Sequence, residues 1–163
     1  TLFVANDQLF DHLHHLPTAL AIVFPGAAIR KLPFNHSSIL VRHGASIQLS
    51  DQCNLLLDGD KRSFIILSKR FFHTHIEPHI VSSFSSELVN LISGIFMTLQ
   101  SHHGYSSFNK LSLPYIHNNS TTIGFQKAEH WRISAGEEVD LSVYVIITKM
   151  MRKVIFLLDG GFE

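Results

Sequence analysis

The clearest alternation of apolar and polar positions lies between residues 83 and 103. Apolar side chains recur there at spacings of three and four, which places them on one face of a helix with 3.6 residues per turn. They are Phe84, Leu88, Leu91, Ile92, Ile95, Phe96 and Leu99. Ser82 or Ser83 suits the N-cap, and Gly104 suits the exit after the last turn. The pattern predicts one long helix over about 83–103.

The rest of the chain is dominated by short runs that are typical of strands. A brief N-terminal helix over 8–16, ended by Pro17, precedes them. We predict strands over 19–24, 38–43, 45–49, 53–57, 63–67, 121–126, 129–134, 141–148 and 154–158. Asp58 and Gly59 form the strongest hairpin signal. Because strands follow one another through short turns, we expect an α+β fold: a mostly antiparallel curved sheet or part-closed barrel, with the two helices.

Length and charge narrow the class of protein. With 163 residues, 45% of them hydrophobic and 16% charged, the chain is expected to form one domain, 1–163. Lys plus Arg equals Asp plus Glu at 13 each, so there is no basic surplus for nucleic acid. The single cysteine, Cys53, excludes an internal disulfide and is expected to be a buried thiol.

No membrane span is expected, because the apolar stretch 88–99 is interrupted by Asn90 and Ser93 and falls short of about 20 residues. The chain begins at Thr1 without a charged leader. We therefore expect a processed protein or an excised soluble domain, with an extracytoplasmic or periplasmic location favoured.

The second face of the long helix is unusual because it lacks charge. Its residues are small or neutral, and no Asp, Glu, Lys or Arg occurs between Glu87 and Lys110. They are Asn90, Ser93, Gly94, Met97 and Ser101. A solvated helix normally carries charges on its outer face, so the chain's own sheet or loop, or a partner, should cover this one. We predict a protein partner or a homo-oligomer contact there.

The chain is unusually rich in histidine. Its 12 histidines titrate mainly between about pH 7.5 and 5.5, where few other side chains do. The clustered ones are candidates for a response to pH: His12, His14, His15, His73, His75, His79, His102 and His103. Like charges within a cluster would repel on acidification. The competing interpretation is that they are ordinary surface residues.

One histidine cluster also has metal-ligand spacing. If residues 71–79 are extended, His73, His75, Glu77 and His79 project to one side. Zinc or iron could bind there, with His117 or His130 as a distant ligand. Exposed histidines on an edge strand are the alternative, which Pro78 favours. We find no nucleophile motif and no acid and base pair, so no catalytic residue and no cofactor are predicted.

These observations favour a non-enzymatic sensory or regulatory domain that responds to pH or to a small apolar ligand and binds a partner chain. Aromatic candidates for an apolar pocket are Phe84, Phe96, Phe125, Trp131, Tyr144 and Phe156. One alternative is a metal-dependent enzyme using His73 and His75, which metal analysis would detect. A structural or assembly subunit is another, and its association state should stay constant between pH 8 and 5.5.

Overall fold

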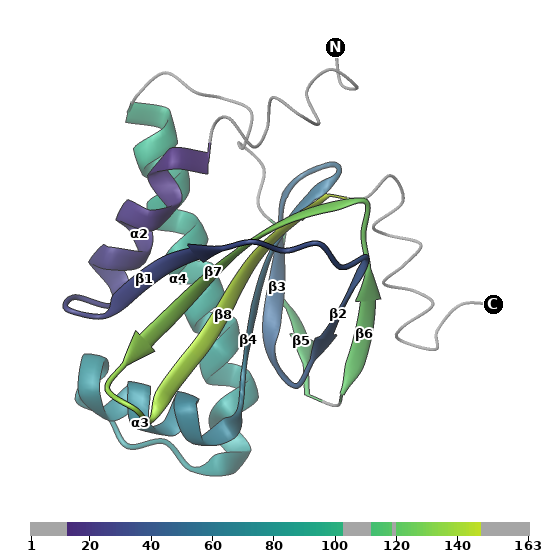
Figure 1. Ribbon diagram of the computed structural model, residues 1–163. Helices are drawn as coiled ribbons and strands as arrows, with labels where there is room; N and C mark the ends of the chain where they lie inside the picture. The colour runs from purple at the N-terminus through teal and green to yellow at the C-terminus, as the bar shows by residue number, and fades with distance from the viewer. Residues whose placement is uncertain (1–12, 103–111, 119, 148–163) are drawn as a thin grey trace.

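The computed structural model describes residues 13–102, 112–118 and 120–147. Its helices are η1 (Leu13–His15), α2 (Leu16–Val23), α3 (Lys61–Phe72), η2 (Pro78–Ile80) and α4 (Val81–His102). Its strands are β1 (Ala28–Leu32), β2 (Ser38–Val41), β3 (His43–Ser50), β4 (Cys53–Gly59), β5 (Tyr115–His117), β6 (Thr121–Gly124), β7 (Lys127–Ala135) and β8 (Val139–Ile147). Figure 1 shows α2 and α4 on one face of a twisted sheet, with the β2 and β6 ribbon beside its other face.

The main sheet has six strands in the order β1-β7-β8-β4-β3-β5. Every neighbouring pair is antiparallel, and β2 pairs with β6 in a separate antiparallel ribbon. The sheet is open, so the predicted α+β class with a mostly antiparallel sheet is confirmed in its curved-sheet form and not as a barrel.

The sheet buries apolar side chains on both faces. On β4, Leu55 and Leu57 belong to the large core beneath the helices. Leu56 points the opposite way and joins a smaller cluster with Tyr144 and the ribbon residue Ile39. This alternation follows from the two-residue period of a strand. The central strand is therefore enclosed by helices on one side and by the ribbon on the other.

The hairpin predicted at Asp58 and Gly59 is wrong. The chain leaves β4 and enters helix α3, so residues 63–67 are helical. Asp60 is the N-cap, and its side chain accepts a 2.7 Å hydrogen bond from the Ser63 amide. Phe64 and Leu67 face the core. This segment forms a helix and not the predicted strand, because the Asp60 side chain caps it and its buried residues lie on one face.

The N-terminal prediction also needs correction. Pro17 lies in the first turn of α2 and does not end the helix, because the first turn needs no amide donor from that residue. The apolar run 19–24, predicted as a buried strand, continues α2 to Val23. The predicted helix start at residue 8 and the predicted strand 154–158 lie outside the described residues.

The long helix is confirmed, although it begins earlier than predicted. It follows η2 directly at Val81, so neither Ser82 nor Ser83 is an N-cap. By length and composition the segment Pro78–His102 could cross a membrane, with a mean hydropathy of 1.4. However, Leu88, Ile92 and Phe96 are buried in the large core with the sheet. That packing is typical of a core helix.

Candidate functional site

The outward face of α4 is the main candidate surface. Asn90, Leu91 and Thr98 are exposed, and a side chain built on Gly94 would meet no atom within 4 Å. Ser93, predicted for this face, is instead buried, and its hydroxyl donates to the Asn90 carbonyl at 3.0 Å. Within the described residues, neither the sheet nor a loop covers Gly94. We predicted that either the chain's own sheet or loop, or a partner, covers this face. Cover by the described part of the chain itself is not found over Gly94.

A groove of about 550 Å³ runs between α4 and α2. It is lined by Ile22, Asn90, Leu91, Gly94, Ile95, Thr98 and Leu99. Ile22 is 53% exposed and Leu91 is 42% exposed, and none of the seven lining residues carries a charge. Paired apolar side chains left in water at the rim of an uncharged groove are typical of a protein interaction site. We call this surface the α2–α4 groove.

Two polar side chains lie at one end of the α2–α4 groove. Glu87 and Asn90 are three positions apart on α4 and both exposed, so they occupy adjacent places on the helix surface. Across the described part of the chain, neither side chain has a hydrogen-bond or ion-pair partner. A carboxylate and an amide are thus available side by side to a ligand or to a partner protein.

The segment with metal-ligand spacing is not a strand. His73 ends α3 in the left-handed conformation with φ of 52°, and Pro78 begins η2. The premise that alternate residues project to one side therefore fails. His75 lies 3.3 Å from the Glu77 carboxylate, with both side chains exposed. In residues 13–102, 112–118 and 120–147, no group of three or more His, Cys, Asp or Glu side chains could hold a metal ion.

The clustered histidines are mostly at the surface. His14, His73, His75, His79 and His102 are exposed, and His15 is half-buried with its ring 4.0 Å from that of His14. His12 and His103 lie outside the described residues.

Burial lowers the pKa of three histidines outside these clusters, and the three are His43, His117 and His130. His117 on β5 is 4% exposed, and desolvation lowers its pKa to about 4. Its Nε2 lies 3.0 Å from the Ser46 hydroxyl. His130 stacks on Tyr144 with ring centroids 4.3 Å apart, and burial, assisted by Arg132, lowers its pKa. His117 and His130 belong to the sheet, and both were predicted only as distant metal ligands.

The aromatic residues predicted to line a ligand pocket do not share one. Phe96 and Trp131 are buried in the large core, and Phe84 packs against it. Tyr144 and Phe125 belong to the smaller cluster beneath the ribbon, on the opposite face of the sheet. Phe156 lies outside the described residues. Trp131 lines a cavity beside α2.

Sequence reasoning missed Ile22 and the pairing of Glu87 with Asn90. Ile22 was assigned to a buried strand, and its exposure became visible only with α2 placed beside α4. The missing charge along α4 was the signal that could have led to the groove. The missing charge identified the α4 side of the groove but not the α2 side.

No family model and no curated protein matches the sequence. Solved structures of chemotaxis proteins resemble the fold. The chemotaxis protein CheX from Vibrio vulnificus has a TM-score of 0.64 at 10% identity, over 83% of this chain and 98% of that one. CheX from Desulfovibrio desulfuricans has a TM-score of 0.61 at 13% identity, over 83% and 95%. The chain has the CheX fold.

A third structure with this fold is a complex. In it, CheX from Borrelia burgdorferi is bound to CheY with beryllium trifluoride and magnesium. The TM-score is 0.55 at 13% identity, over 86% of this chain and 97% of that one. At such identities the likeness to CheX establishes the architecture alone.

Proposed function

We propose that this chain is a regulatory domain that binds a phosphorylated receiver domain of the CheY type. The observation that carries the proposal is the exposed, uncharged α2–α4 groove, with Ile22 and Leu91 at its rim. The CheX–CheY complex supports the kind of partner, since that protein shares the fold. Beryllium trifluoride imitates a phosphoryl group on a carboxylate, which favours the phosphorylated form of the receiver.

The groove suits a partner surface that is apolar and follows the helix. Gly94 leaves room for close approach in the middle of α4, and the flanking apolar side chains would lose their contact with water on binding. Once a partner covers the groove, Ile22 and Leu91 would lie inside the contact. Two such apolar residues can dominate the affinity when the neutral residues around them exclude water. The receiver is therefore expected to lie across both helices.

The binding test uses a CheY-type receiver domain from the same organism, with and without beryllium trifluoride and magnesium. Leu91→Asp places an uncompensated charge in the contact and should weaken binding at least about tenfold, which corresponds to about 1.4 kcal/mol. Leu113→Asp is the matched control, because Leu113 is 90% exposed and does not line the groove. Equal affinities for both variants would contradict the proposal.

A second candidate function is acceleration of hydrolysis of the receiver's acyl phosphate, favoured by the unpartnered pair Glu87 and Asn90. In that step a water oxygen bonds to phosphorus while the bond from phosphorus to the carboxylate oxygen breaks. The products are the free carboxylate and inorganic phosphate, and a water proton passes to solvent. A carboxylate and an amide one turn apart can orient that water, as side chains do in other phosphoryl transfers.

Decay of the phosphorylated receiver tests this second function. Asn90→Ala and Glu87→Gln should slow the decay while the affinity for the receiver with beryllium trifluoride changes little. Ser86→Ala is the control, since Ser86 neighbours Glu87 and does not line the groove. If the unaltered chain binds the receiver without changing its decay, the domain is a binding module only.

We also propose a response to acidity. It arises from a buried histidine of the fold and not from the histidine clusters at the surface. To gain a proton, His117 must give up a buried neutral state, because burial lowers its pKa. Loss of the folded groove at low pH would then reduce receiver binding, whichever of the two functions holds.

A further inference from the structure

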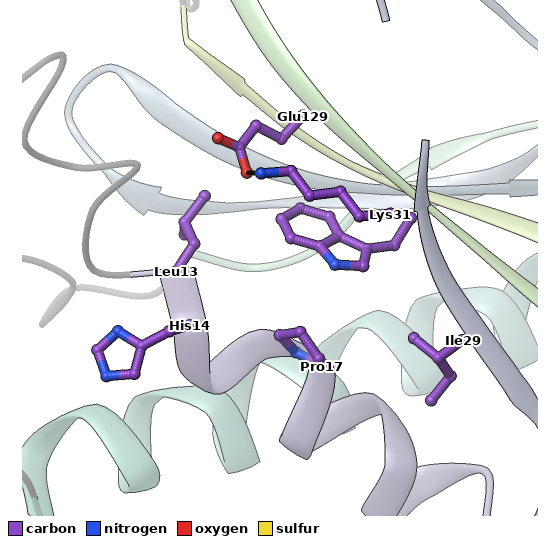
Figure 2. Close-up of a pocket in the computed structure, with 7 residues that line it drawn as sticks. Leu13, His14, Pro17, Ile29, Lys31 and Glu129 are labelled. Atoms are coloured by element: carbon purple, nitrogen blue, oxygen red, sulfur yellow. Dashed lines mark ion pairs between the residues drawn. The ribbon is translucent and has the colours of Figure 1, made fainter. Parts of the chain in front are cut away.

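A second cavity lies on the other side of α2, away from the α2–α4 groove. It measures about 410 Å³, a size that accommodates small metabolites. It is lined by Leu13, His14 and Pro17 from the helical segment, by Ile29 and Lys31 from β1, and by Glu129 and Trp131 from β7. Figure 2 shows the helical residues facing those of β1, with Lys31 reaching Glu129 above them.

The walls of this cavity are mainly apolar. Leu13 is 2% exposed and Trp131 is 4% exposed, so both are held in place by the surrounding core. Pro17 and Ile29 complete the apolar lining. A branched aliphatic or aromatic group of modest size can therefore leave water here without disturbing the packing.

An ion pair closes the polar side of the cavity. Lys31 Nζ lies 3.2 Å from Glu129 Oε1, and the Glu129 side chain is only 18% exposed. Lys31 stands directly opposite Trp131 in the β1–β7 register, with its ammonium 5.7 Å from the centroid of the Trp131 ring. Opposite residues of an antiparallel pair share a face, so the pair belongs to the same side of the sheet as the apolar walls.

The sign of these charges limits the ligand. A simple carboxylate that binds Lys31 must compete with Glu129 and leave that half-buried anion without its cation. A simple amine that binds Glu129 only replaces the Lys31 ammonium, whose side chain is 60% exposed and stays in water, so it gains no second charged contact. The carboxylate ligand therefore leaves a largely buried anion without its cation, and the amine exchanges one ammonium for another. A molecule whose ammonium and carboxylate are bonded to one carbon can contact both partners at once.

We propose that this cavity binds a free α-amino acid with an apolar side chain. Its carboxylate accepts hydrogen bonds from the Lys31 ammonium, and its ammonium donates to the Glu129 carboxylate. Its side chain lies among Leu13, Pro17 and Trp131. The site is separate from the proposed receiver-binding surface, since none of these residues lines the α2–α4 groove.

The experiment exploits Trp131, which is the only tryptophan of the chain and lines the cavity. Titration of the full chain with L-leucine should change its fluorescence saturably. Isoamylamine and 4-methylpentanoate are leucine without its carboxylate and without its amine, respectively. Each should bind at least about tenfold more weakly than leucine. Because this series uses the unaltered chain, it does not depend on the folding of any variant.

Single substitutions test whether Glu129 and Lys31 bind the charged groups of the ligand. Glu129→Gln should weaken leucine binding about tenfold or more, and Lys31→Met should do the same. Glu138→Gln is the matched control, because Glu138 forms a comparable 3.0 Å ion pair with Arg62 away from the cavity. No saturable change up to about 10 mM leucine, a concentration that would reveal even very weak binding, overturns the proposal. Equal binding of all three ligands, or insensitivity to both variants, does so as well.

Discussion

The buried imidazole of His117 allows a quantitative prediction about acid stability. Burial lowers its pKa to about 4 in the folded chain, against about 6.5 when it is unfolded. As pH falls through 6.5, the unfolded chain binds a proton that the folded chain does not bind until the pH approaches 4. The unfolded state is therefore favoured progressively in that window, and stability falls with acidity.

The size of the effect follows from the two pKa values. Between about pH 7 and pH 5 the proton linkage of this one group amounts to about 2 kcal/mol, and by pH 4 to about 3 kcal/mol. A loss of this size is a large fraction of the 5 to 15 kcal/mol, roughly, by which most domains are stable. No other histidine with a resolved shift is as deeply buried among the described residues.

Urea unfolding at about pH 7 and pH 5 measures this linkage. His117→Gln removes the titrating group while keeping a side chain that can reach Ser46. Its absolute stability is expected to be lower, and its loss between the two pH values should be smaller than that of the unaltered chain by about 2 kcal/mol. His102→Gln, at an exposed position on α4, controls for losing an imidazole. If His117→Gln loses as much stability as the unaltered chain, the reasoning is refuted.

Three further predictions concern single positions in the fold. Gly44→Ala would place a methyl carbon 1.7 Å from the Leu57 carbonyl oxygen, so urea unfolding should show a loss of about 1 to 3 kcal/mol or more, whereas Gly94→Ala should gain up to about 1 kcal/mol. A neutral or stabilising Gly44→Ala would contradict the close approach of β3 and β4. Asp60→Ala removes the cap of α3 and should cost about 1 kcal/mol, with partial recovery in Asp60→Ser. Cys53 is fully buried and burial raises its pKa, so a thiol reagent should modify it only in denaturant, and rapid reaction under native conditions would show that the core opens locally.

The architecture was predictable where a segment satisfies a single period. The spacing in α4 fits only a helix, and the alternation in β8 fits only a strand with both faces covered. Residues 64–67 are different, since Phe64, Ile65, Ile66 and Leu67 are consecutive and suit either period. The cap at Asp60 decides in favour of a helix, and the neighbouring turn signal at Asp58 and Gly59 concealed it.

The candidate site was predictable only in part. The absence of charge along α4 identified one wall of the α2–α4 groove from composition alone. The second wall depends on α2 packing against α4, a contact between segments about 70 positions apart that no local pattern contains. Likewise, Lys31 and Glu129 meet only because β1 pairs with β7. Histidine spacing misled because it presumed a strand at residues 73–79.

Helix α2 separates the two depressions, with Pro17 lining the cavity at its first turn and Ile22 lining the groove near its end. A small shift or stiffening of this eight-residue helix would change both sites together. Thermodynamic reciprocity then fixes the relation: whatever factor a small molecule imposes on the affinity for a protein partner, the partner must impose on the affinity for the small molecule. Helix α2 would thereby couple the binding of an amino acid to the binding of a protein partner.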